Sequence, residues 1–184
     1  MLTLERLETL LSPALFCVSG RPAVITPIRY RYAQRLLGHS SQTSFLPVSM
    51  SNLFQERAFI SGPQSFRHLS RGTLVLFYES KHPRAPGELV VIARVRRSYL
   101  KSGATLDGSD LSRSVLTPDS LPEIGAAELK TVTTFDNVLP LPRAVPRRTL
   151  QRLGCGRPND LITTRPIDDA QLQEILSEAF NSGK

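Results

Sequence analysis

The fold is decided by the stretch Arg71-Gly-Thr-Leu-Val-Leu-Phe-Tyr-Glu-Ser80, followed by Gly87-Glu-Leu-Val-Val-Ile-Ala-Arg-Val95. Residues 73–78 have the continuous apolar character of a buried strand, and residues 88–95 repeat it. Prolines and a glycine between the two runs predict a turn, so together they predict an antiparallel hairpin. Because neighbouring side chains of a strand point to opposite faces, we do not expect both Phe77 and Tyr78 in the core. We expect Tyr78, with Glu79 and Ser80, near a site.

Local patterns predict helices on both sides of this hairpin. Apolar spacing and stop signals favour helices at 2–11, 30–37 and 147–153. A last helix is expected at 169–180, where Asp168 is a good N-cap and Gln171 is placed to complete a capping box. These helices lie toward the two ends of the chain.

Strand character appears at 23–28, 129–141 and 161–164, whereas weaker patterns suggest an extended stretch at 43–48 and a helical turn at 51–57. Residues 98–122 are polar and contain glycines and prolines, so we expect an excursion or flexible insertion there. Central strands with helices at both ends predict an α+β domain around a twisted, mostly antiparallel sheet.

Composition and charge exclude several classes of protein. The chain has 184 residues and a net charge of +7, and its basic residues are 19 arginines and 4 lysines. No apolar run approaches the roughly 18 residues of a membrane helix, and the N-terminus lacks the features of a signal peptide. Two distant cysteines, Cys17 and Cys155, do not indicate a disulfide framework or a Cys-rich zinc site. We therefore expect a cytoplasmic protein without metal or cofactor.

The motifs of common catalytic and phosphate-binding sites are missing from the sequence. It has no Gly-x-Ser-x-Gly elbow, Walker A motif or dinucleotide fingerprint, and Cys155 between two glycines is typical of a packing residue. Arginines alternate with aromatic residues, a pattern that suits a nucleic-acid surface on which arginines hold phosphates and aromatic rings stack on bases. The alternative is an aromatic core with a solvated arginine face.

The two quoted strands resemble the PUA-like superfamily, particularly its ASCH and EVE-related branches. There, a glycine begins a strand of the form G-x-x-V-x-F-Y, and the next strand reads G-x-x-V-A-x-A-R-V. Residues 25–38 are similar to the helix that opens ASCH domains. Residues 131–138 and 146–154 look like PUA-like modules associated with bacterial acetyltransferase-like proteins. The resemblance covers residues 23–180 and implies a small, partly open β-barrel of mostly antiparallel strands with flanking helices. It suggests a domain at 23–184 after an N-terminal helix and lead-in at 1–22.

The resemblance implies a cleft that receives RNA, or a single base flipped out of a duplex. The partner would then be RNA or DNA, with an acetyltransferase-like protein as a second possible partner. Tyr30 or Tyr78 would stack on the base, and Gln42 and Asn137 would contact its edge, unless these polar groups satisfy turns instead. The full set of candidate nucleic-acid-binding residues is Arg29, Tyr30, Gln42, Ser44, Arg57, Tyr78, Glu79, Ser80 and Asn137.

The hydrolase branch of the ASCH proteins carries Gly-x-Lys-x-x-Thr after this helix. Here Ser40 stands where the lysine belongs, and serine cannot supply the amine chemistry of a lysine. A non-catalytic reader of nucleic acid is therefore favoured, and Glu79 and Lys81 are only weak catalytic candidates. Two alternatives remain: a ribonuclease or nucleobase amidohydrolase using the same cleft, and a protein-interaction module that docks through its N-terminal helix.

Overall fold

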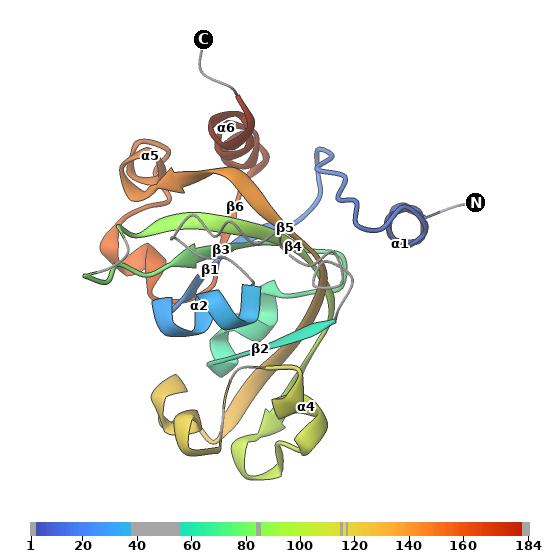
Figure 1. Cartoon of the computed structure of the whole chain (residues 1–184), viewed down its shortest axis with the longest axis vertical. Helices are drawn as coiled ribbons and strands as arrows, with labels where there is room; N and C mark the ends of the chain where they lie inside the picture. Colours follow the sequence, from blue (N-terminus) through green and yellow to red (C-terminus); the bar gives the residue numbers. More distant parts are fainter. Residues whose placement is uncertain (1–2, 38–55, 84–85, 115, 117, 182–184) are drawn as a thin grey trace.

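The computed structural model describes residues 3–37, 56–83, 86–114, 116 and 118–181. Six strands form one sheet in the order β2-β5-β4-β3-β1-β6 (Figure 1). The strands are β1 (Ala23–Ile28), β2 (Arg57–Ser61), β3 (Leu74–Glu79), β4 (Glu88–Ser102), β5 (Leu129–Pro146) and β6 (Arg165–Ile167). Only β1 and β3 pair in parallel. Within the described residues, β2 and β6 stand at opposite ends of this order. The α+β class and the open, mostly antiparallel sheet are thus confirmed.

The predicted hairpin is β3 and β4, but β4 and β5 are longer than the sequence suggested. They pair from Glu88 opposite Pro146 to Ser102 opposite Leu129, with three shifts of register along the ladder. Bulges of this kind break the apolar alternation from which a strand is recognised. The expected excursion at 98–122 therefore begins as strand, and the chain leaves the sheet only after Ser102.

The segment that joins β4 to β5 is packed against the sheet, contrary to the flexible insertion expected there. It contains η2 (Gly103–Thr105), α4 (Gly108–Ser112) and η3 (Pro118–Ile124). Apolar side chains spaced along this polar segment contact Ala58, Ile60 and Val132, and they are Leu106, Leu111, Leu116, Leu121 and Ile124. Their burial gives the segment a small core of its own.

The sheet is covered on both faces, so it has two cores. Figure 1 shows α5 (Arg147–Arg152) and α6 (Asp169–Phe180) on one side of the sheet and α2 (Tyr30–Leu37) on the other. Tyr78 belongs to the core on the α5 and α6 side, and Phe77 to the core under α2. Both are almost fully buried. The expectation that they could not both be core was wrong, because it assumed that one face of β3 meets water.

The remaining local predictions are mostly confirmed. Helix α2 has the expected bounds, and α6 has the expected capping box between Asp168 and Gln171. Cys155 is buried, and its Sγ lies 3.5 Å from the Leu150 carbonyl, as expected for a packing residue. The strand expected at 161–164 was wrong, because η4 (Pro158–Leu161) comes first and β6 follows it. Strand β2 begins at Arg57, where a helical turn was expected, and residues 43–48 lie outside the described chain. Between β2 and β3 lies η1 (Pro63–His68).

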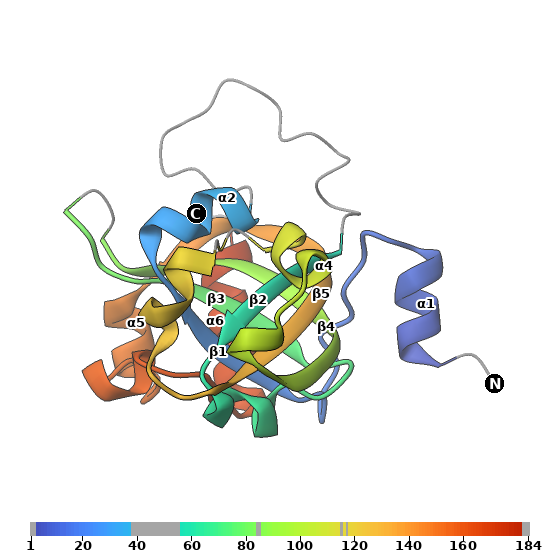
Figure 2. The ribbon, with the colours of Figure 1, turned by 90° about the horizontal axis from the view of Figure 1, so that it is seen from below.

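Helix α1 (Leu4–Leu10) lies beside the sheet (Figure 2) and is joined to it by buried ion pairs. The Glu8 carboxylate is inaccessible to solvent and accepts from Arg21 at 2.5 and 3.0 Å and from Arg94 at 3.2 Å. Arg94 also binds both carboxylate oxygens of Asp136, at 2.9 and 2.7 Å. These contacts connect the N-terminal segment to β4 and β5. No described helix is long and apolar enough to span a membrane.

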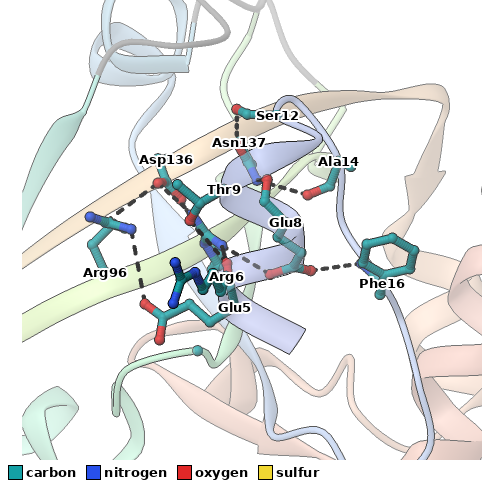
Figure 3. Close-up of polar contacts among 12 residues, drawn as sticks. Glu5, Arg6, Glu8, Thr9, Ser12, Ala14, Phe16, Arg96, Asp136 and Asn137 are labelled. Atoms are coloured by element: carbon teal, nitrogen blue, oxygen red, sulfur yellow. Dashed lines mark hydrogen bonds and ion pairs between the residues drawn. The ribbon is translucent and has the colours of Figure 1, made fainter. Parts of the chain in front are cut away.

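Asn137 on β5 holds the chain that follows α1 (Figure 3). Its Nδ2 donates to the Ala14 carbonyl at 2.7 Å, and its Oδ1 accepts from the Ser12 hydroxyl at 2.6 Å. Its φ of 50° is in the left-handed region, which asparagine tolerates better than most residues. The buried amide thus bonds to a side chain and a carbonyl of the segment that follows α1, and it does not lie in position to contact a base edge as was expected.

Candidate functional site

A pocket of about 550 Å³ opens between α2 and the neighbouring strands. The end of β1 and the side chains of Tyr32 and Leu36 on α2 form one side of it. Strand β2 and the start of η1 form another. The wall is completed by Ser114, Leu116, Glu123, Ile124 and residues 161–164. The pocket therefore draws its wall from segments spread across most of the chain.

The pocket wall combines an aromatic and aliphatic surface with a few polar groups. Phe59 is half-buried in this wall, and its ring packs edge-on against Phe77 with centroids 5.6 Å apart. The hydroxyls of Thr26 and Thr164 satisfy each other at 3.2 Å. The Ser61 hydroxyl is buried, and among the described residues it has no hydrogen-bond partner. Since a buried polar group without a partner is costly, Ser61 is a candidate for a polar contact in this wall.

The mouth of the pocket carries a cluster of charged groups centred on Glu123 of η3. Arg29 donates to Glu123 Oε2 at 3.1 Å and to its carbonyl oxygen at 3.2 Å. The Tyr32 hydroxyl donates to the same Oε2 at 2.7 Å, and Arg31 donates to it as well. The side chains of Arg29 and Arg31 are both more than half exposed. A solute that approaches the pocket meets these cations first.

Only part of the predicted site is brought together by the fold. Arg29 and Ser80 line the pocket, because the parallel strands β1 and β3 end side by side. Tyr30 does not line the pocket, and its ring is stacked on that of His82 with the ring centroids 4.8 Å apart. Lys81 is exposed on the hairpin turn. Gln42 and Ser44, like Ser40, lie outside the described residues.

Two predicted binding residues are buried in the body of the protein. Arg57 donates to the Leu36 carbonyl at the end of α2, and burial lowers the pKa of its guanidinium. Tyr78 lies in the core on the side of the sheet away from α2, where it cannot stack on a base in the pocket. Arg57 therefore supports α2, and Tyr78 supports the opposite core.

Glu79 is also buried, and one of its carboxylate oxygens, Oε2, has no partner among the described residues. Burial, together with the charge of neighbouring Glu88, raises the pKa of Glu79 to about 7. Glu79 is not among the residues that line the pocket. No group of three or more His, Cys, Asp or Glu is placed to hold a metal ion in the part of the chain that is described.

Sequence reasoning missed Ser61 and Gln64 on the far wall of the pocket. It counted Phe59 among the aromatic residues of a nucleic-acid surface but did not assign it to the site. A short apolar run ending at Gly62-Pro63 was a signal for the end of a strand and could have located Phe59 and Ser61. Glu123 had no signal, because it is one charged residue in a polar segment. Its importance arises only from contacts with residues more than 90 positions away in the sequence.

The open six-stranded sheet with helices on both faces is the fold of solved ASCH structures. An ASCH variant from Zymomonas mobilis superposes with a TM-score of 0.65 at 10% identity, covering 88% of this chain and 99% of that one. A Pseudomonas putida protein superposes with a TM-score of 0.51 at 18% identity, covering 84% of this chain and 97% of that one. Human THYN1, solved in complex with 5-methylcytosine-containing DNA, gives 0.48 at 11%, covering 88% and 99%. At these identities the likeness to the Zymomonas mobilis and Pseudomonas putida structures shows the fold alone. No protein-family model matches the chain, and no curated protein does so either.

Proposed function

We propose that this protein is a nucleic-acid-binding module that takes a single base of RNA or DNA into the pocket under α2. The observation that carries the proposal is the pocket itself. It joins an aromatic wall, the buried Ser61 hydroxyl, which no other described residue satisfies, and exposed arginines at its mouth. Its volume of about 550 Å³ lies within the usual range for small-ligand sites, about 300–1,000 Å³.

Each part of the pocket suits one part of a nucleotide. The rings of Phe59 and Tyr32 offer surfaces against which a base can stack. Ser61 and Gln64 offer hydrogen-bonding groups for its edge, which is how an extruded base is identified. Arg29 stands where the sugar–phosphate backbone would leave the pocket. Because the wall contacts a base from several sides, a modified base would be read directly.

Binding to fluorescently labelled single-stranded RNA and DNA, measured by anisotropy, tests this function. Since arginines hold the backbone, affinity should fall steeply between about 50 and 200 mM salt. Replacing Phe59 with leucine keeps an apolar side chain but removes the ring, and should weaken binding by about fivefold or more if one base stacks there. Phe66→Leu is the matched control, because Phe66 is an exposed phenylalanine outside the pocket.

The proposal fails if the protein retains no oligonucleotide, modified or plain, at low salt. It also fails if Phe59→Leu and Phe66→Leu bind equally well. Circular dichroism of both variants establishes that they are folded before their affinities are compared.

A hydrolase is the second candidate function. Its acid–base group would be Glu79, which has a raised pKa and directly precedes Ser80 of the pocket wall, although Glu79 itself does not line the pocket. A carboxyl group with a pKa of about 7 is suited to general acid–base work near neutral pH. Incubation with RNA and with acetylated nucleosides decides this point, because a hydrolase must turn over one of them and Glu79→Gln must abolish that turnover. The cytoplasmic location and the acetyltransferase-like partner stay predictions.

A further inference from the structure

The contacts around Glu123 point to a second element of the site. We propose that Arg29, Arg31 and Tyr32 form a phosphate site at the mouth of the pocket, which Glu123 occupies until the phosphate of a bound nucleotide displaces it. This inference rests on the proposed function, and it adds both the chemical group that is bound and an internal competitor for it.

The first argument is the number of donors that meet at one atom. Arg29, Arg31 and Tyr32 all donate to Oε2 of Glu123, whereas among the described residues no side chain donates to Oε1. A carboxylate oxygen has about two lone-pair positions, so three donors exceed what this oxygen can accept in good geometry. A phosphate group offers several oxygens, so each donor would have an acceptor of its own.

The second argument is charge. Two guanidinium groups face one carboxylate, so the cluster keeps a positive charge while Glu123 is in place. A phosphodiester carries the same single negative charge as Glu123 and can replace it without leaving the arginines less well compensated. Arginine is also suited to phosphate, because its planar fork presents parallel donors.

The third argument is position. Arg29, Tyr32 and Glu123 all line the pocket, so an anion held there would lie at the mouth through which the base enters. The Arg31 guanidinium lies over the Tyr32 ring, 4.8 Å from its centroid, and this cation–π contact holds it beside the same mouth.

The fourth argument is that Glu123 can leave at little cost. Its side chain is 34% exposed, and both of its arginine partners are more than half exposed. Ion pairs between side chains this exposed contribute little to stability, because water and salt screen them. Glu123 therefore competes with phosphate without closing the site, and the measured affinity is lowered by the fraction of molecules in which it is bound.

The test compares Glu123→Gln with Glu128→Gln, which removes the same charge from an exposed residue outside the pocket. Inorganic phosphate is titrated into each protein while the Nε–H resonances of Arg29 and Arg31 are followed by NMR. Labelled oligonucleotide is titrated separately. We expect Glu123→Gln to bind both about tenfold more tightly than the unmodified protein, and Glu128→Gln to change either affinity less than about twofold.

A second pair of variants assigns the gain to the arginine cluster. Adding Arg31→Met to Glu123→Gln should remove the gain in affinity. Adding Arg35→Met instead, one helical turn further along α2, should leave that gain intact. The inference is overturned if Glu123→Gln and Glu128→Gln give equal affinities, or if Arg31→Met and Arg35→Met have equal effects.

The two proposals fail in different ways. Oligonucleotide binding that depends on Phe59 but not on Glu123 leaves the base pocket standing and removes the phosphate site. Tighter binding of inorganic phosphate by Glu123→Gln, without any oligonucleotide binding, keeps the phosphate site and removes the proposed function.

Discussion

Replacing Glu8 with glutamine should destabilise the protein far more than the same change at Glu5, although both residues lie on α1. The Glu8 side chain is fully buried and binds Arg21 and Arg94, whose side chains are 6% and 1% exposed. Without the carboxylate, Arg94 keeps Asp136, whereas Arg21 keeps only backbone carbonyl oxygens. Breaking a buried ion pair in this way costs about 3–5 kcal/mol.

The free energy of unfolding should therefore fall by about 3 kcal/mol in Glu8→Gln, which for a chain of this size lowers Tm by roughly 6–12 °C. Glu5 pairs with Arg71, whose side chain is 68% exposed, so Glu5→Gln should cost less than about 1 kcal/mol. The free energy of unfolding of both variants is measured by urea titration. Circular dichroism is the signal, because the protein has no tryptophan for fluorescence. Equal losses in the two variants would refute the conclusion that the Glu8 ion pairs fix α1 to the sheet.

Three further predictions concern the core and its pH dependence. Burial raises the pKa of Glu79 from its ordinary 4.5 to about 7, so the folded protein holds this proton more tightly than the unfolded chain and loses stability as pH rises between these values. The Glu79→Gln variant has no such proton to lose. Its free energy of unfolding, relative to that of the unmodified protein, should therefore rise by about 2 kcal/mol between pH 5 and 8. A difference in stability that does not change with pH would contradict this prediction. Gly156→Ala should cost about 1–3 kcal/mol in thermal unfolding, because the new Cβ would lie 2.4 Å from the Gln151 nitrogen, whereas Gly108→Ala meets nothing within 4 Å and should be almost neutral. Phe77→Ala should cost about 3–5 kcal/mol in urea unfolding, and a loss below 1 kcal/mol would show that its core repacks freely.

The elements predicted correctly are those whose signals are local. Helix α6 was found at its observed bounds because Asp168 and Gln171 form a capping box immediately before an apolar stripe. Strand β1 and helix α2 were found for the same kind of reason, since each shows its own period over a short segment.

The misplaced elements depend on contacts with distant segments. Strand β2 is stabilised by pairing with β5 more than 70 residues later, and the second half of β4 depends on the same partner. Tyr78 was assigned to a site because the helices that cover its face of the sheet come from the other end of the chain. Local sequence patterns do not predict which distant segments will pair with these strands or cover them.

The residues of the candidate site likewise divide into those with a local sequence signal and those placed by distant contacts. Arg29 and Ser80 follow two strands that end together, so their closeness could be inferred from the strands alone. Phe59, Ser61 and Glu123 come from segments that contain no sequence signal for a shared pocket. Arg57 was a candidate nucleic-acid-binding residue, but it is buried and its guanidinium donates to the Leu36 carbonyl of α2.

The attachment of α1 also has a consequence for how the protein is made. The Ser12 hydroxyl binds Asn137, which lies 125 residues further along the chain, and Glu8 must await Arg94 in the same way. At translation speeds of about 5–20 residues per second, that interval lasts roughly 6–25 s. Helix α1 therefore leaves the ribosome before the strands that hold it and reaches its final position only after they have been made. Until then the Glu8 carboxylate remains in water, so the nascent chain does not bury an unpaired charge during synthesis.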